Sequence, residues 1–204
     1  MSKLILVRHG ESEWNKEGKW TGITDIPLTE KGRREAKEAE KALKTVPIDI
    51  AFTTPLSRAR ETLDIILHTL NLHIPVTVDA ALNEKDYGEL TGKNKWKIKE
   101  EYGEEQFTKW RRSWDSPPPK GEALKDVYNR VIPYYKENIE LLLKEGKNVM
   151  IVAHGNSLRA LTKELENISD EDIPKLELAT GEVWIYDVDT SGKILHKEVM
   201  KFHE

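Results

Sequence analysis

Short apolar runs alternate with longer amphipathic stretches along the chain. The short runs are rich in branched apolar side chains and end in polar residues, which predicts buried strands. These strands are expected at residues 3–7, 48–53, 76–78 and 148–153. Apolar positions at helical spacing, with capping residues before them, predict helices. The helices are expected at residues 29–44, 54–70, 123–145 and 157–166. A hairpin is expected over residues 182–187 and 193–199.

The stretch from about residue 81 to residue 121 interrupts this alternation. Residues 93–114 within it have a helical pattern that Gly103 breaks, and a run of three prolines ends the helix. We interpret the stretch as a small helical cap insertion. Strands that alternate with helices favour a single α/β domain over residues 1–204, with a mostly parallel central sheet flanked by helices on both faces.

The composition limits the classes of function. The 204 residues carry a formal charge of −4, which argues against a chain-wide basic surface for nucleic acid. Cysteine is absent, which excludes disulfides, thiolate metal sites and cysteine nucleophiles. The apolar runs are far shorter than the roughly 20 residues that a bilayer requires, and no signal peptide is recognised. We therefore expect a cytoplasmic protein that acts on small molecules, with no nucleic-acid or membrane partner.

Two segments resemble each other, because each ends an apolar strand with His-Gly. The first ends in His9-Gly10 and the second in His154-Gly155. In an open α/β sheet, ligands bind beyond the carboxyl ends of the strands, so two neighbouring strands would bring both imidazoles to one crevice. The glycines let the backbone approach a ligand closely, and their N–H groups can face an anion.

Two other interpretations of the histidines stay open at this point. Each histidine can merely end its strand and bond a nearby carbonyl. A metal site is the second alternative, because histidine is a common metal ligand. The chain has no HxH, HExxH or HxxxH spacing, however, so no metal is expected.

Arginines close to the histidines favour a phosphorylated ligand. Arg8 precedes His9, and Arg58 lies in the helix that follows the second expected strand. The arginine fork matches phosphate oxygens, and a helix N-terminus adds partial positive charge. A histidine nucleophile surrounded by arginines can take a phosphoryl group. The leaving oxygen also needs a proton donor, for which Glu84 is the candidate. Burial or a nearby phosphate charge would keep such a carboxyl protonated near neutral pH.

Longer motifs support this chemistry and extend over nearly the whole chain. The RHGE motif at residues 8–11 is followed, in order, by WTG, PLTEKG, LNEKDYG, GKNK, WRR and HGNSLRAL. The RHGE motif resembles the signature of the histidine phosphatase superfamily. The later motifs resemble the cofactor-dependent phosphoglycerate mutases within that superfamily, and they are much more specific.

The resemblance implies a role for each matching residue. His9 is the phosphorylated nucleophile, His154 hydrogen-bonds the transferring phosphoryl group, and Glu84 is the general acid and base. The residues that hold the phosphoryl group are Arg8, Arg58 and Asn15. The residues that contact substrate or support the pocket are Thr21, Gly22, Tyr87, Lys95, Arg111, Arg112, Gly155 and Asn156. The implied reaction interconverts 3-phosphoglycerate and 2-phosphoglycerate in glycolysis and gluconeogenesis. It is primed by 2,3-bisphosphoglycerate and needs no metal.

A second basic cluster separates a mutase from a plain phosphatase. Lys95, Arg111 and Arg112 lie in the expected cap, where they can hold the far anionic group of a substrate that must reorient. A broad-specificity histidine phosphatase acting on small phosphomonoesters is the main alternative, and it needs no such cluster. A binding module for phosphorylated ligands is another alternative, although a binder needs no proton donor.

Three features depart from the longer bacterial mutases. Only residues 113–122 join the cap to the next helix, the tail after the last strand is short or absent, and Asp86 stands where many mutases have histidine. Monomer and homodimer both stay open. Because a more open site lets water reach a phosphohistidine, we expect a mutase with elevated phosphatase leakage.

Overall fold

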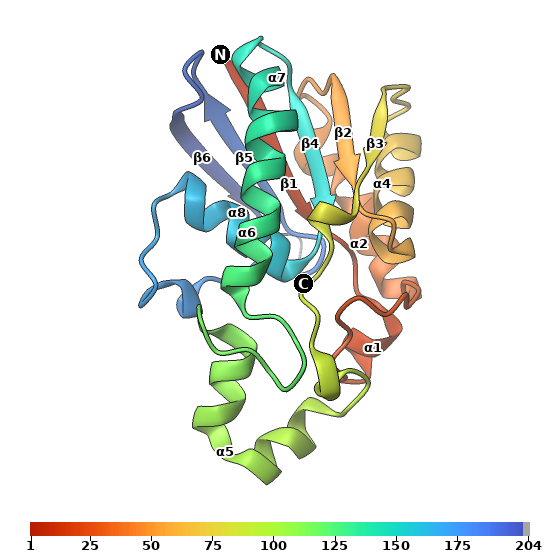
Figure 1. Ribbon diagram of the computed structural model, residues 1–204. Helices are drawn as coiled ribbons and strands as arrows, with labels where there is room; N and C mark the ends of the chain where they lie inside the picture. Colours follow the sequence, from red (N-terminus) through yellow and green to blue (C-terminus); the bar gives the residue numbers. More distant parts are fainter. Residues whose placement is uncertain (202–204) are drawn as a thin grey trace.

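The computed structural model describes residues 1–201, which form one six-stranded sheet with helices on both faces (Figure 1). The strands are β1 (Ser2–Arg8), β2 (Ile50–Thr53), β3 (Val76–Val78), β4 (Val149–Ala153), β5 (Val183–Val188) and β6 (Ile194–Met200). Their order is β3-β2-β4-β1-β5-β6. The first four strands in this order are parallel, and β5 and β6 are antiparallel additions. The predicted mostly parallel sheet and the predicted hairpin are confirmed.

The two strands with His-Gly ends are neighbours in the centre of the sheet. Strand β1 pairs with β4 in parallel, and the register sets Arg8 opposite Ala153. The next residues along the chain, His9 and His154, therefore leave the sheet side by side at its carboxyl edge. Both strands are covered on both faces, which explains their continuous apolar runs.

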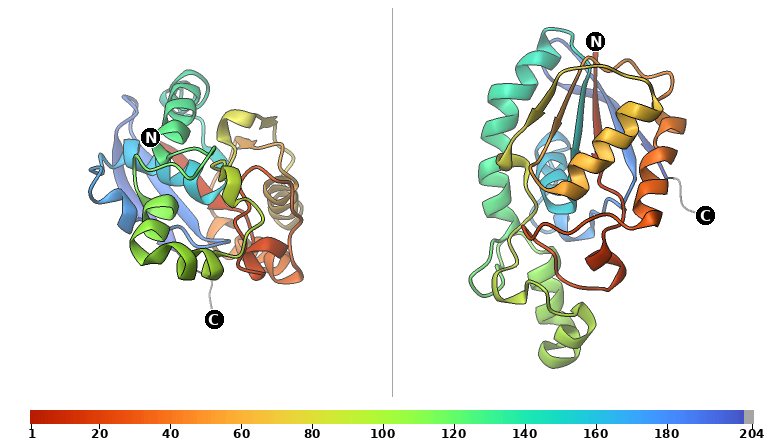
Figure 2. Two further views of the ribbon diagram at one scale, coloured as in Figure 1. Left: turned by 60° about the horizontal axis from the view of Figure 1, so that its bottom comes forward. Right: turned by 90° about the vertical axis from the view of Figure 1, so that its right-hand side faces the viewer.

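Two apolar layers fix the position of the sheet. Because side chains alternate along a strand, Leu4 and Leu6 of β1 enter one core, whereas Ile5 and Val7 enter the other. The first core is closed by α6 (Leu124–Tyr134), α7 (Glu140–Lys144) and α8 (Gly155–Leu165). The second is closed by α3 (Glu40–Leu43) and α4 (Ser57–Thr69), and α2 (Glu30–Glu38) packs against α4 on the same face. Figure 2 shows the sheet between these two sets of helices.

Three predicted helices differ in detail from the structure. The stretch predicted as one helix at residues 29–44 divides at Ala39 into α2 and α3. The long helix at residues 123–145 contains Pro133, which has no N–H for the helical ladder. Its backbone widens into a π-helical turn, η3 (Tyr135–Ile139), before α7 begins. Helix α4 begins at Ser57, so Pro55 precedes the helix rather than opening it.

Residues 81–121 lie beyond the carboxyl ends of the parallel strands (Figure 1). They include α5 (Lys95–Arg112), whose axis breaks at Gly103, where φ is +83°. Short 3₁₀ turns, η1 (Ala80–Leu82) and η2 (Gly88–Leu90), lead into it. This part has a separate small apolar cluster of Trp20, Tyr87, Leu90, Ile98, Phe107 and Trp110. The sequence also concealed α1 (Glu13–Lys16), a single turn capped by Ser12.

Within residues 1–201, no helix is both long enough and apolar enough to cross a lipid bilayer.

Candidate active site

A polar pocket opens where β1 and β4 end and where α5 faces the sheet. Residues from six separate parts of the chain line it. They are Arg8, His9, Asn15, Thr21, Gly22, Arg58, Glu84, Tyr87, Lys95, Arg111, Arg112, Gly155, Asn156, Arg159, Glu177 and Leu178. The wall thus combines six guanidinium or ammonium groups with two carboxyls, which suits a ligand carrying several negative charges.

His9 is held in one tautomer by a backbone hydrogen bond. Its side chain is buried, with 2% exposed, and its Nδ1–H donates to the carbonyl of Gly10 at 2.7 Å. That bond leaves Nε2 without its proton and free to attack. Burial, followed by the charges of Arg58 and Arg8, holds the pKa of His9 well below its usual range. The imidazole is therefore neutral at physiological pH, as an attacking nitrogen must be.

His154 packs behind His9 and uses the other nitrogen. The two ring centroids are 5.0 Å apart, and His154 has no exposed surface. Its Nε2 meets the hydroxyl of Thr54 at 2.9 Å, whereas its Nδ1 has no partner among the described residues. Burial and the nearby Arg58 charge hold its pKa well below the usual range. If the Thr54 hydroxyl donates to Nε2, the proton stays on Nδ1 as a free donor.

Two arginines stand beside His9, and each is held by backbone oxygens. Arg8 Nη1 donates to the Leu178 carbonyl at 2.5 Å, while its buried Nε has no partner within residues 1–201. Arg58 is 1% exposed and donates to the carbonyls of Gly22 and Thr24 at 2.7 and 2.8 Å. Gly22 reaches that geometry with a φ of +57°, which favours glycine. Both cations are therefore fixed before any ligand arrives.

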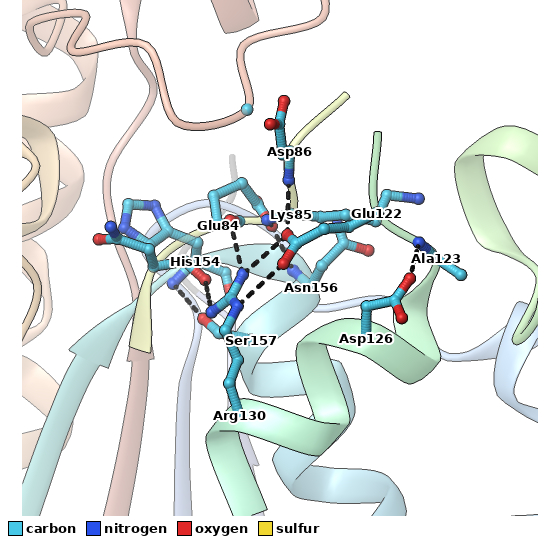
Figure 3. A network of polar contacts seen from close by, with 12 residues as sticks. Glu84, Lys85, Asp86, Glu122, Ala123, Asp126, Arg130, His154, Asn156 and Ser157 are labelled. Atoms are coloured by element: carbon cyan, nitrogen blue, oxygen red, sulfur yellow. Dashed lines mark hydrogen bonds and ion pairs between the residues drawn. The ribbon is translucent and has the colours of Figure 1, made fainter. Parts of the chain in front are cut away.

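The Glu84 carboxyl points into the pocket from a loop that is held on both sides (Figure 3). Its Oε1 accepts the N–H of Lys85 at 2.8 Å and the N–H of Asn156, in the first turn of α8, at 3.1 Å. Behind it, Arg130 donates to the carbonyls of Ala81, Asn83 and Glu84, each at 2.9 Å.

Glu122 completes this clamp. It binds Arg130 through both carboxylate oxygens, at 3.1 and 3.0 Å, and one of them also accepts the N–H of Asp86 at 2.8 Å. Arg130 and Glu122 thus bind backbone groups on both sides of Glu84, and the Glu84 side chain itself lines the pocket. The same contacts place Asp86, the residue that departs from the mutase pattern, outside the pocket wall.

The opposite side of the pocket carries the second basic cluster. Lys95 lies in the first turn of α5, and Arg111 and Arg112 lie in the last turn. Burial, with the Arg111 charge next, lowers the pKa of Lys95 to about 8. Burial also lowers the pKa of Arg111. Positive charges brought together in a partly buried wall are stabilised when an anion binds between them.

Polar side chains connect the two sides. The Tyr87 hydroxyl accepts Asn156 Nδ2 at 2.9 Å, and Arg159 Nη1 donates to Asn156 Oδ1 at 2.9 Å. Burial raises the pKa of Tyr87 to about 12, so its phenol stays protonated. Asn15 uses its side-chain oxygen to cap α1 through Ser12, which leaves its NH₂ group for the pocket.

The structure brings all but one of the residues predicted for the site to the pocket wall. The exception is His154, which is not among the lining residues although its ring packs against that of His9. Gly10 also differs from expectation, because its N–H donates to Thr62 Oγ1 at 3.1 Å instead of facing the pocket.

Sequence reasoning missed Arg159, Glu177 and Leu178. Arg159 had a signal, since it is a charged residue inside the otherwise buried run of α8. Glu177 is one of 36 acidic residues and follows no pattern that would single it out.

An α/β sheet that presents a neutral histidine, two fixed arginines and a carboxyl at its carboxyl edge defines a class of phosphoryl-transfer proteins that use histidine as nucleophile. The chain belongs to the histidine phosphatase superfamily (branch 1), whose family model matches residues 4–199.

Comparison with individual proteins agrees with this family. A 2,3-bisphosphoglycerate-dependent phosphoglycerate mutase of Cytophaga hutchinsonii is 51% identical over 92% of this chain and 88% of its own. Among solved structures, Bacillus stearothermophilus YhfR has a TM-score of 0.83 at 29% identity, covering 96% of this chain and 95% of its own. The α-ribazole phosphatase of Shigella flexneri has a TM-score of 0.79 at 26% identity, covering 95% and 94%.

Proposed function

We propose that the chain interconverts 3-phosphoglycerate and 2-phosphoglycerate, as an isomerase of glycolysis and gluconeogenesis. The observation that carries this proposal is the basic cluster of Lys95, Arg111 and Arg112 across the pocket from His9. A substrate with two anionic ends needs cations at both ends of its site. The names of the relatives, at 44% to 51% identity, support the same reaction.

The proposed chemistry assigns each proton and each bond. From phosphorylated His9, the free hydroxyl of the monophosphoglycerate attacks phosphorus and gives its proton to Glu84, and the bond from phosphorus to Nε2 breaks. Nε2 then attacks the other phosphate of the resulting bisphosphate, the bond from phosphorus to the substrate oxygen breaks, and that oxygen takes the proton back from Glu84. Arg8, Arg58 and the Nδ1–H of His154 stabilise negative charge on the phosphoryl oxygens. Phosphohistidine at His9 is the intermediate.

The pocket fits 2,3-bisphosphoglycerate as the primer. Three buried polar atoms, Arg8 Nε, Thr21 Oγ1 and His154 Nδ1, have no partner among residues 1–201. A phosphate group offers acceptors for each of them. Arg8, Arg58, Asn15 and His154 would hold the phosphate beside His9, and the second basic cluster would hold the remaining anionic groups. When bound, this primer supplies the phosphoryl group that loads His9.

A phosphatase acting on small phosphomonoesters is the second candidate. The likeness to the α-ribazole phosphatase structure favours it, because both activities share the histidine chemistry. The short connection at residues 113–122 also favours phosphatase activity, since an open site admits water to phosphohistidine. We therefore propose a mutase that also releases phosphate, with residues 81–121 serving as a cap on a single domain.

The surroundings of the enzyme are part of the proposal. Its substrates are small, multiply charged anions that do not cross a lipid bilayer unaided, which supports a cytoplasmic location. Neither a nucleic acid nor a membrane surface is part of the proposed activity. The active unit is a monomer or a homodimer, since every group in the proposed chemistry comes from one chain.

A coupled assay tests the proposal. Conversion of 3-phosphoglycerate to 2-phosphoglycerate is followed with and without 2,3-bisphosphoglycerate, with a chelator throughout, while phosphate release is recorded in the same samples. We expect primer-stimulated, chelator-resistant isomerisation that exceeds phosphate release. Phosphate release without isomerisation would establish the phosphatase, and loss of all turnover in chelator would contradict the metal-free mechanism.

A further inference from the structure

Glu177 is a negatively charged side chain in a pocket that is otherwise built for anions. Of the described residues that line the pocket, only Glu84 and Glu177 carry carboxyls. Glu84 has a place in the proposed proton transfer, whereas Glu177 has none. Its Oε2 lies 2.8 Å from Nη2 of Arg112, in the second basic cluster. Glu177 therefore pairs with Arg112, a cation that the proposed function assigns to the anionic end of the ligand.

The backbone on both sides of Glu177 is fixed by pocket arginines. Arg159 Nε donates to the Leu176 carbonyl at 3.0 Å, and Arg8 Nη1 donates to the Leu178 carbonyl at 2.5 Å. The same Arg159 donates to the carbonyl of Arg112 at 2.8 Å. These bonds set Glu177 and Arg112 opposite each other. A pair built into the pocket frame in this way differs from the exposed ion pairs that long side chains form by chance.

Glu177 is ionised when it faces Arg112. Burial acts to raise the pKa of its carboxyl, but the hydrogen bond and charge of Arg112 outweigh burial. The charges of Arg111 and Arg8 lower that pKa further. The side chain is still 55% exposed, so solvent screens part of its charge.

We propose that Glu177 is a specificity-determining residue that weakens the binding of bisphosphorylated ligands more than that of monophosphorylated ones. The inference rests on the proposed function. A monophosphoglycerate with its phosphate beside His9 presents one carboxylate to this side of the pocket, whereas bisphosphoglycerate presents a carboxylate and a second phosphate. Coulomb repulsion from Glu177 grows with the charge that it faces. The residue therefore promotes release of bisphosphoglycerate.

Binding measurements separate this role from a structural one. A His9→Gln background stops turnover, and calorimetry at fixed ionic strength then gives the dissociation constants of 2,3-bisphosphoglycerate and 3-phosphoglycerate. Glu177→Gln keeps an acceptor for Arg112 but removes the charge. We expect it to tighten binding of the bisphosphate about tenfold and of the monophosphate about threefold or less. Glu177→Ala should act in the same direction.

Glu105→Gln is the matched control. Glu105 also pairs with a cation on α5, Lys109, and its removal changes the net charge equally, but it is absent from the pocket wall. We expect both dissociation constants to stay unchanged in this variant. Equal tightening for both ligands in Glu177→Gln, or weaker binding in both Glu177 variants, would overturn the inference. Failure of the His9→Gln protein to bind either ligand would instead count against the proposed function.

Discussion

The two His-Gly turns look alike in sequence but hold their imidazoles in opposite ways. His9 is fixed through Nδ1 by the carbonyl of Gly10, so Nε2 is the free nitrogen. His154 is met at Nε2 by the Thr54 hydroxyl, so Nδ1 is the free nitrogen. Both rings are buried, and burial holds both pKa values well below the usual range. Burial favours the neutral form of both histidines, and the hydrogen-bond partner decides which nitrogen of each ring is left free.

The glycines of the two turns differ as well. A Cβ on Gly10 would lie 2.2 Å from the backbone oxygen of Gly32, on α2. A Cβ on Gly155 would meet only the Arg8 guanidinium, at 3.4 Å. The first glycine therefore serves the packing of the fold, whereas the second leaves space beside the Arg8 side chain in the pocket.

The largest expected effect is the loss of turnover in His9→Ala. Because His9 is the only histidine among the described residues that line the pocket, isomerisation and phosphate release should both fall by about 10⁴-fold or more. The coupled assay measures both rates, and far-ultraviolet circular dichroism checks that the variant is folded. Substantial turnover in the folded variant would contradict the assignment of the nucleophile.

His154→Ala should lower the rate of turnover strongly without abolishing it. It removes one donor to the transferring phosphoryl group, which typically costs about 10²- to 10³-fold in rate. His9 should still become phosphorylated, only more slowly, as rapid-quench labelling would show. Thr54→Val is the milder companion, because it removes the hydroxyl that orients His154 and leaves His9 untouched. A loss of turnover in His154→Ala as severe as that in His9→Ala would contradict the different roles given to the two histidines.

Substitution of the two glycines compares packing with ligand space. Gly10→Ala forces backbone of the His9 turn and α2 apart, and should lower the free energy of unfolding by about 3 kcal/mol or more. Gly155→Ala should change it by less than about 1 kcal/mol. It should lower activity instead, because the added methyl group takes up pocket space at van der Waals distance from Arg8. Urea unfolding of both variants, with the coupled assay, tests this pair. The reverse order of stabilities would be inconsistent with the packing described.

Acid stability should depend equally on the two histidines. Each has a folded-state pKa below the unfolded value of about 6.5, so the unfolded chain binds the proton first as the pH falls. The stability is fully present above that pH. It then declines by about 1.4 kcal/mol per pH unit for each histidine until the folded-state pKa is reached. His9→Gln and His154→Gln should each flatten this decline between pH 6 and 5 in urea titrations. An unaltered slope in either variant would mean that its imidazole is already charged in the folded protein.

Much of the fold and the pocket could be predicted from the sequence, because motif residues stand directly at strand ends. Arg8 and His9 follow β1, and Gly155 and Asn156 follow β4, so the sheet alone brings them together. Other features depend on tertiary packing that no local pattern records. Arg130 and Glu122 bind the backbone of residues 81–86, and Glu177 pairs with Arg112, so that each of these contacts joins segments far apart in the sequence. The π-helical turn after Pro133 was similarly hidden within a helical pattern.

Locating the phosphoryl group after treatment with 2,3-bisphosphoglycerate tests the central claim most directly. The protein is quenched in alkali, which preserves phosphohistidine, and peptides containing His9 and His154 are analysed by mass spectrometry. Phosphorus NMR of the quenched protein distinguishes the two ring nitrogens. We expect one phosphoryl group, on Nε2 of His9, and none on His154. A phosphoryl group on His154, or on Nδ1 of His9, would contradict that claim.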